Sequence, residues 1–138
     1  QWDAAMKFVA DSTHSTSDST SWGNYKNNEW TITRTTASFA TNISSGSWTK
    51  IDSSEKSKTN SESILLTTGA SDTFKAKNIF DLAGNVYEWT MEADNSTYRV
   101  GRGGYYGFNG SSSPTSLRHG YSPTSSGVYI GFRSALYL

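Results

Sequence analysis

The sequence predicts an α+β domain, and three features lead to this class. Its 138 residues are enough for one domain with a core of its own. It carries 5 Trp, 8 Tyr and 6 Phe at zero formal net charge, whereas disordered chains are poor in aromatic residues and highly charged. One helical pattern stands at the start, and short alternating patterns with long polar connections follow it.

The helical pattern covers the first residues. Trp2, Ala5, Met6 and Val9 are spaced i, i+3, i+4 and i+7, which places them on one face of an α-helix. Because no capping residue precedes this helix, we expect the sequence to begin inside a larger protein or domain and to lack an N-terminal part. Residues 11–21 are rich in Ser, Thr and Asp without periodicity and are expected to form a loop.

Most of the remaining chain is predicted to form short strands. Residues 52–63 are polar and of mixed charge, and 107–126 are rich in Gly and Ser, so both are expected to be irregular connections. In one predicted strand, Tyr87 and Trp89 share a face and are expected to pack in the core, while Glu88 points to the other face. The β-prone pieces are 30–34, 39–43, 47–51, 63–68, 85–91, 98–104 and 128–137, of which the last alternates most clearly.

The composition excludes several classes of function. No apolar run approaches the roughly 18 residues of a membrane-spanning helix, so membrane insertion is not expected. Zero net charge and the absence of a Lys/Arg cluster argue against nucleic acid as a partner. The chain contains no Cys, which excludes disulfides, thiolate zinc sites and thiol catalysis by its own side chains.

Three motifs carry a resemblance to a known family. They are NIFDLAGNVYEW at 78–89, RVGRGGY at 99–105 and IGFR at 130–133. In this order and spacing they resemble the formylglycine-generating enzyme (sulfatase-modifying factor) family, and QWDAA at 1–5 and SWGN at 21–24 are similar to its helix and loop motifs. The resemblance implies one C-type-lectin-like domain over 1–138, with an irregular antiparallel sheet, few helices and long ordered loops.

The first motif also carries the candidate metal residues. Gly84 and Asn85 suit a tight turn, because Gly and Asn tolerate left-handed backbone geometry. The resemblance implies that oxygen atoms near Asn85 and Glu88 can hold Ca²⁺, a hard cation, and no other cofactor is expected. The alternatives are a hydrogen-bonded turn without a metal, and a catalytic carboxylate pair formed by Asp81 and Glu88.

The chain departs from the family's enzymes in its cysteines. In those enzymes cysteines that follow the motif matched by RVGRGGY carry the reaction, whereas residues 105–114 here read YYGFNGSSSP. We therefore expect no enzymatic activity of the formylglycine-generating type. The two histidines, His14 and His119, do not make an iron site without a partnering carboxylate, and His14 is expected to be solvated in its Ser/Thr-rich loop.

The resemblance extends to the variable proteins of diversity-generating retroelements, which are binding proteins of phage tips and bacterial surfaces. Their last stretch varies by mutagenesis of template adenines, typically in AAC and AAT codons, which cannot then encode Lys, Glu, Gln, Met or Trp. Here the 7 Lys, 5 Glu, 1 Gln, 2 Met and 5 Trp all stand at or before Glu92, and none occurs in the last 46 residues. A loop segment with a local composition bias would give the same pattern. The candidate variable region is about 98–137.

Aromatic residues with polar tips and small polar residues in that region are predicted to bind a ligand, as they do in antibody paratopes. We expect most of these side chains to be exposed and close together, with Phe132 and Arg133 buried beside them. The eight candidates are Tyr105, Tyr106, Phe108, Asn109, His119, Tyr121, Ser122 and Tyr129.

These observations predict a non-catalytic, hypervariable binding domain. Its expected partner is a protein or glycan receptor on a cell surface, and its expected place is extracellular, at a virion tip or on a bacterial cell surface. An oligomer is compatible with this role. The alternatives are an oxidase of the formylglycine-generating type or an inactive relative of one, and a structural module of a surface protein.

Overall fold

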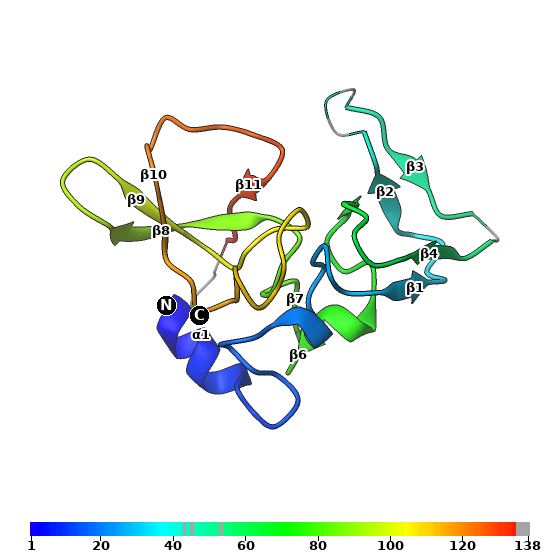
Figure 1. The fold of residues 1–138 in the computed structure, drawn as a ribbon, viewed down its shortest axis with the longest axis horizontal. Helices are drawn as coiled ribbons and strands as arrows, with labels where there is room; N and C mark the ends of the chain where they lie inside the picture. Colours follow the sequence, from blue (N-terminus) through cyan, green and yellow to red (C-terminus); the bar gives the residue numbers. More distant parts are fainter. Residues whose placement is uncertain (43, 45, 53, 135–138) are drawn as a thin grey trace.

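Residues 1–42, 44, 46–52 and 54–134 are described by the computed structural model of this chain. Within these ranges a single α-helix is followed by short strands and 3-10 turns (Figure 1). The elements are α1 (Trp2–Val9), η1 (Thr20–Trp22), β1 (Trp30–Ile32), β2 (Ser38–Ala40), β3 (Thr49–Lys50), β4 (Lys56–Lys58), β5 (Leu65–Leu66), η3 (Asp72–Phe74), β6 (Lys75–Ala76), β7 (Ile79–Phe80), β8 (Tyr87–Ala93), β9 (Arg99–Arg102), β10 (His119–Tyr121) and β11 (Ile130–Gly131).

The strands form small sheets, nearly all of them antiparallel. β1 pairs with β4, β6 pairs with β7, and β2 lies between β3 and β5. The largest sheet has the order β10-β9-β8-β11, in which β11 runs parallel to β8. In Figure 1 this sheet lies in the left half of the molecule, and β1 to β4 lie in the right half. The arrangement agrees with the predicted α+β class.

The helix α1 forms where the periodicity predicts it. Val9 is fully buried, and Trp2 and Ala5 pack against the apolar cluster that contains Val9 and Tyr25. The indole N–H of Trp2 also donates to the carbonyl of Thr115 at 3.0 Å. Because an eight-residue helix is too short to be stable alone, these tertiary contacts stabilise it.

A second apolar cluster lies under the strands of the other half. Trp30 and Ile32 of β1 are buried there while Thr31 between them is exposed, which confirms the alternation predicted for this strand. Trp30 meets Phe74 edge-on, with 6.3 Å between ring centroids. Leu66 of β5 belongs to the same cluster, so β1 and β5 share one core.

Two buried asparagines connect segments that are distant in the sequence. The side-chain amide of Asn24 donates to Oδ1 of Asn85 at 3.0 Å, and Asn85 exchanges hydrogen bonds with the backbone of Leu66. Gly84 and Asn85 have φ angles of 71° and 63°, which confirms the predicted left-handed turn. A Cβ on Gly84 would lie 2.5 to 2.8 Å from backbone atoms of Asn24, so only glycine fits this close approach.

Several strand predictions need correction. β4 lies within 52–63 and β10 within 107–126, both expected to be irregular. Their sequences lack an apolar alternation, and pairing with β1 and β9 gives them their extended conformation. Of the predicted strand 128–137, only β11 forms within 128–134, because just two of its residues pair with β8, and 135–137 lie outside the described residues.

Candidate functional site

One face of the four-stranded sheet is covered by aromatic side chains. Alternation along β8 places Tyr87 and Trp89 on this face, and alternation along β10 places His119 and Tyr121 on it. Gly101 of β9 lies between them, paired with Trp89 on one side and His119 on the other. A Cβ on Gly101 would lie 3.3 Å from the ring of Tyr121, so the missing side chain leaves room for that ring to lie across β9.

Rings from the neighbouring loops join these four. Centroid separations between neighbouring rings run from 4.5 Å for His119 and Tyr121 to 6.1 Å for Tyr121 and Tyr129. Aromatic pairs at such distances attract one another in tilted and edge-on arrangements, so the rings stabilise each other's positions. We call this set the aromatic layer; its members are Tyr87, Trp89, Tyr105, Phe108, His119, Tyr121 and Tyr129.

Tyr87 forms the base of the aromatic layer. It is fully buried, and its ring lies 5.4 to 5.6 Å from the rings of Tyr105, His119 and Tyr121. Its hydroxyl is 2.6 Å from the hydroxyl of Ser113, in the loop that follows Phe108. Burial raises the pKa of Tyr87, so its phenol stays neutral.

The structure brings five of the eight predicted site residues together: Tyr105, Phe108, His119, Tyr121 and Tyr129. Of the other three, Tyr106 packs against Tyr105 from outside the layer, and Asn109 and Ser122 lie apart from it. Tyr106 is buried, edge-on to Tyr105; Asn109 is exposed in the next loop; and the hydroxyl of Ser122 pairs with that of Thr124 at 2.9 Å.

The expected exposure pattern is wrong. Of the eight residues only Phe108 and Asn109 are exposed, because the rings of the layer cover one another. Phe132 is 81% exposed and the Arg133 side chain is 33% exposed, although both were expected to be buried. The reason is that β11 ends at Gly131, so these two residues lie beyond the paired part of the sheet.

Two members of the aromatic layer were missed as site residues. The alternation in 85–91 correctly placed Tyr87 and Trp89 on one face and Glu88 on the other, but that face was taken as core. Tyr87 is buried as expected, whereas Trp89 is only half-buried and meets Tyr121 edge-on at 6.0 Å. Gly101 of the RVGRGGY motif was the sequence signal for this face, because a glycine inside a strand often marks a place where another group lies close to the backbone.

The opposite face of the sheet carries charge. Arg102 of β9 is buried there; it donates to Asp3 of α1 at 3.0 Å, to Glu92 of β8 at 3.1 Å and to the carbonyl of Ser116 at 2.8 Å. Glu92 also pairs with Arg118. Arg102 therefore has a structural role, since its guanidinium joins α1, the sheet and the loop before β10.

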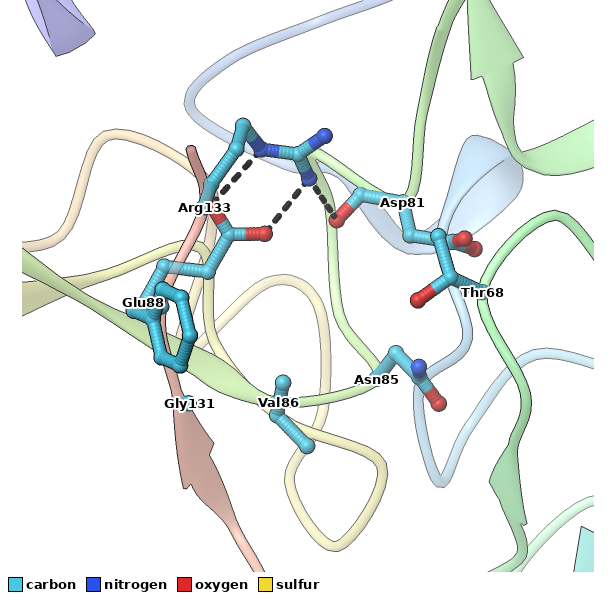
Figure 2. Close-up of a pocket in the computed structure, with 8 residues that line it drawn as sticks. Thr68, Asp81, Asn85, Val86, Glu88, Gly131 and Arg133 are labelled. Atoms are coloured by element: carbon cyan, nitrogen blue, oxygen red, sulfur yellow. Dashed lines mark hydrogen bonds and ion pairs between the residues drawn. The ribbon is translucent and has the colours of Figure 1, made fainter. Parts of the chain in front are cut away.

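A small pocket of about 160 Å³ lies beside β11, lined in part by Asp81, Asn85, Glu88 and Arg133 (Figure 2). Arg133 donates to both oxygens of Glu88, at 2.8 and 2.5 Å, and to the carbonyl of Asp81 at 3.2 Å. Oδ2 of Asp81 accepts from the Gly69 N–H at 2.7 Å, and its buried Oδ1 has no partner among the described residues. Burial raises the pKa of Asp81 to about 6 and also raises that of Glu88.

The two calcium candidates are engaged by protein groups. Oδ1 of Asn85 accepts from Asn24 and from the Leu66 N–H, while its amide donates to the Leu66 carbonyl. Glu88 is paired with Arg133. The side chains of Asn85 and Glu88 therefore do not fit a cation in this arrangement, and no three His, Asp or Glu side chains of the described residues gather as a metal site would require.

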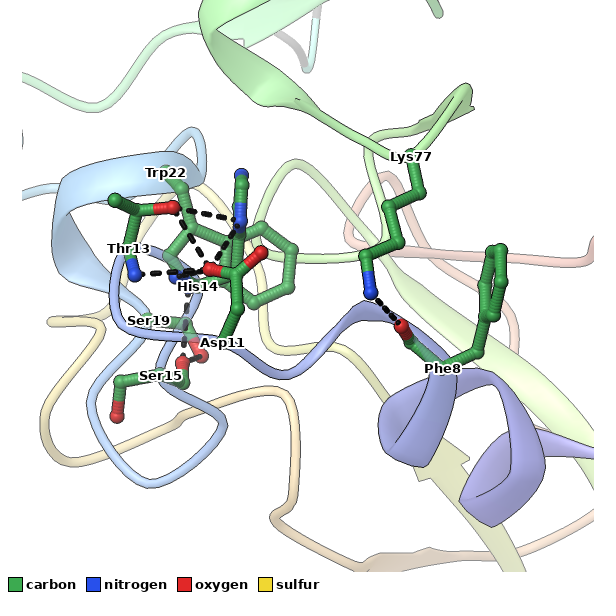
Figure 3. A network of polar contacts seen from close by, with 8 residues as sticks. All are labelled: Phe8, Asp11, Thr13, His14, Ser15, Ser19, Trp22 and Lys77. Atoms are coloured by element: carbon green, nitrogen blue, oxygen red, sulfur yellow. Dashed lines mark hydrogen bonds and ion pairs between the residues drawn. The ribbon is translucent and has the colours of Figure 1, made fainter.

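His14 is not simply solvated as expected. Figure 3 shows its ring beside Asp11 and Trp22; Nδ1 lies 2.9 Å from Oδ1 of Asp11, and the ring is edge-on to Trp22 at 5.3 Å. The same carboxylate oxygen accepts from the hydroxyl of Thr13 at 2.8 Å and from the N–H groups of Thr13 and His14, and these hydrogen bonds, that of the hydroxyl most of all, lower the pKa of Asp11. This cluster orders the loop after α1 and lies outside the aromatic layer.

The aromatic layer offers ring faces, phenol hydroxyls and one imidazole. It can stack on and hydrogen-bond a ligand, but it holds no thiol, since the chain has no Cys. No helix of the described residues is long and apolar enough to cross a membrane.

Comparison with known proteins supports the resemblance seen in the motifs. No curated protein and no solved structure matches the chain. The family model described as "Sulfatase-modifying factor enzyme 1-like domain" matches residues 4–138, nearly the whole sequence. On this match, together with the left-handed Gly84-Asn85 turn and the Glu88–Arg133 pair that its motif residues build, the chain belongs to the sulfatase-modifying factor enzyme 1-like family.

Proposed function

We propose that this chain is a non-catalytic member of its family that binds a receptor through the aromatic layer. One observation carries the proposal: five of the seven rings come from the last 46 residues, the segment that lacks Lys, Glu, Gln, Met and Trp. In this view the segment is the variable region of a diversity-generating retroelement protein with a C-type-lectin-like fold. The protein acts outside the cell, at a virion tip or on a bacterial surface.

The arrangement of the sheet supports different roles for its two faces, one in holding the scaffold together and the other in binding. Arg102, Glu92 and Asp3 connect one face of the sheet to α1, and substitutions there would remove the ion pairs of the buried Arg102 guanidinium. The aromatic layer on the other face is only partly covered, and several of its side chains come from loops and the edge strand β10. Loops positioned by a rigid scaffold are where proteins commonly place recognition residues.

The neighbourhood of the gene tests the variable-region proposal. We expect a reverse transcriptase gene nearby, and a near-copy of the last part of the coding sequence that differs mainly at adenines. The differing codons should map onto Tyr105, Phe108, His119, Tyr121 or Tyr129 rather than onto Arg102 or Ser113. A neighbourhood with neither the enzyme nor the copy would contradict this origin.

An activity assay tests the non-catalytic part of the proposal. The alternative, an oxidase of the formylglycine-generating type, would convert the cysteine of a Cys-x-Pro-x-Arg peptide to formylglycine. Since the chain has no Cys to supply a thiolate, we expect no mass change in the peptide with or without copper. A metal-dependent loss of mass at the peptide cysteine would overturn the proposal.

The proposal includes no bound cofactor. Addition of Ca²⁺ or of a chelator should leave the melting temperature unchanged, because a ligand that binds only the folded state would raise it. A rise in melting temperature with calcium that Glu88→Gln abolishes would contradict this part.

A further inference from the structure

We propose, resting on the binding function proposed above, that the aromatic layer binds a neutral glycan, with pyranose rings stacked on Tyr105, Tyr121 and Tyr129.

The rings of the three tyrosines lie close together: the centroid of Tyr129 is 5.6 Å from that of Tyr105 and 6.1 Å from that of Tyr121. Burial raises the pKa of Tyr121, and the nearby phenols of Tyr87, Tyr129 and Tyr105 raise it further; the phenol of Tyr129 likewise adds to the effect of burial on Tyr105. The phenols of Tyr105 and Tyr121 therefore stay protonated, and a phenol hydroxyl can both donate and accept a hydrogen bond. Among these four hydroxyls in the described structure, only that of Tyr87 has a protein partner, Ser113.

The ring faces of the layer are not occupied by cations. The cation–π contacts of the described residues involve Phe8, Trp30, Phe39 and Phe80, all outside the layer. A ligand that stacks on the tyrosine rings therefore displaces no cation of the described residues.

The layer itself carries no Asp, Glu, Lys or Arg side chain. Arg99 lies opposite Tyr121 at the end of the β9–β10 ladder and so shares the face of the layer, where one of its guanidinium N–H groups donates to the carbonyl of Tyr98. Gly120, between His119 and Tyr121, faces the carboxylate of Asp94 on the other side of β10. Apart from Arg99 at the end of this ladder, a ligand stacked on the rings of Tyr105, Tyr121 and Tyr129 would meet aromatic and phenol groups, and this surface suits an uncharged ligand.

A pyranose fits this combination of groups. It presents C–H groups on one face, which pack on an aromatic ring, and hydroxyls around its edge, which can pair with the three free phenols. A protein partner would bury about 800 Å² on this side, a wide area anchored by Trp, Tyr or Arg side chains. Most rings here are half-buried, with only Phe108 exposed, which suits a small stacked unit better than a wide interface.

A glycan array that carries neutral hexose and N-acetylhexosamine oligosaccharides beside sialylated and uronic-acid glycans tests the proposal with the intact chain. We expect binding confined to a subset of the neutral glycans. The triple variant Tyr105→Phe, Tyr121→Phe, Tyr129→Phe keeps the rings and removes the free hydroxyls. It should bind at least about ten-fold more weakly with an unchanged melting temperature.

Tyr98→Phe is the matched control, because Tyr98 is an exposed tyrosine without a ring contact to the layer. Glycan binding by this variant should not change.

No binding to any neutral glycan, or equal binding by the triple variant, would overturn the glycan proposal. Binding to cells distinguishes this failure from failure of the proposed function. Layer-dependent cell binding that resists periodate but is lost after proteinase treatment would exclude a glycan and keep a receptor-binding role. Cell binding that no layer variant weakens would overturn both.

Discussion

At the scale of single residues, Asp81 is a carboxyl group held in the interior with few polar partners. It is 5% exposed, one of its carboxylate oxygens lacks a partner within the described structure, and its pKa is raised to about 6. A carboxyl whose folded pKa exceeds its unfolded value of 3.8 binds its proton more tightly in the folded state. Its contribution to stability is therefore greatest at low pH and falls as the pH rises from about 4 through 6.

Asp81→Asn removes the free-energy cost of ionising a buried carboxyl group, and its amide oxygen can still accept from the N–H of Gly69. We expect the variant to be more stable than the parent at pH 7.5, by at most about 3 kcal/mol, and equally stable near pH 3.5. Chemical denaturation of both proteins across this range, with a chelator present, measures the difference. A variant less stable than the parent at pH 7.5 would show that the ionised carboxylate has a favourable partner.

Sequence reasoning placed single residues well where one local rule decided. The left-handed conformation of Gly84 and Asn85, and the facing of Tyr87, Trp89 and Glu88, follow from turn chemistry and alternation. It failed for Phe132 and Trp89, because burial depends on which distant segment covers a side chain. Local periodicity carries no information about that segment.

At the scale of elements, the Gly84-Asn85 turn leads into β8 and packs against the loop that contains Asn24. The turn is fixed by the N–H of Asn85 donating to the carbonyl of Asn24 at 2.9 Å and by the buried amide pair. We expect Gly84→Ala to cost about 3 kcal/mol or more, because the positive φ and the overlap with Asn24 add together. Thermal melting checks this, with Gly46→Ala as control: Gly46 also has a positive φ, but its Cβ would meet nothing within 4 Å. Equal losses would mean that φ alone decides the cost.

β11 is held to the sheet by two paired residues and by the ion pair between Glu88 and Arg133. Arg133→Met leaves the buried carboxylate of Glu88 without its partner and should cost about 2 kcal/mol, a low value for such a pair because a third of the Arg133 side chain meets water. Adding Glu88→Gln should recover part of the loss. A double-mutant cycle measured by denaturation gives the coupling free energy between Glu88 and Arg133. Strictly additive effects would contradict a stabilising ion pair between them.

The strand predictions show the same limit at this scale. Pieces with alternating apolar residues, such as β1 and β8, were identified, although their ends were not. β4 and β10 have polar or glycine-containing sequences and are strands only because β1 and β9 lie beside them. Most of the residues of the aromatic layer could be predicted from the sequence, but the extent to which each ring is buried could not. This burial depends on how rings contributed by several segments pack together.

At the scale of the whole molecule, the first twenty residues are bound to the segment around residue 115. Ser19 is fully buried, and its hydroxyl accepts from the N–H and the hydroxyl of Thr115 at 3.0 and 2.9 Å. Trp2 donates to the carbonyl of Thr115, and Asp3 pairs with Arg102. The candidate variable segment therefore also contains residues that complete the scaffold.

Ser19→Ala should leave both donors of Thr115 without an acceptor in the interior and destabilise the fold by about 2 kcal/mol. Hydrogen exchange should show lost protection at Thr115 and along α1. Ser17→Ala, an exposed serine in the same loop, is the control and should change neither measurement. Unchanged exchange along α1 in Ser19→Ala would mean that the helix does not depend on this contact.

The ties between the N-terminal twenty residues and the segment around Thr115 also set the order of events during synthesis. Trp2 and Thr115 are separated by 113 positions, so α1 leaves the ribosome long before its partners exist. An isolated eight-residue helix does not persist in water, and contacts across almost the whole chain form slowly. The nascent chain should therefore remain protease-sensitive until Arg102 and Thr115 have both emerged, and a ribosome-bound fragment that ends before them should not fold. Any change in the late segment that hinders these contacts would leave the whole chain, not only its binding face, exposed to degradation.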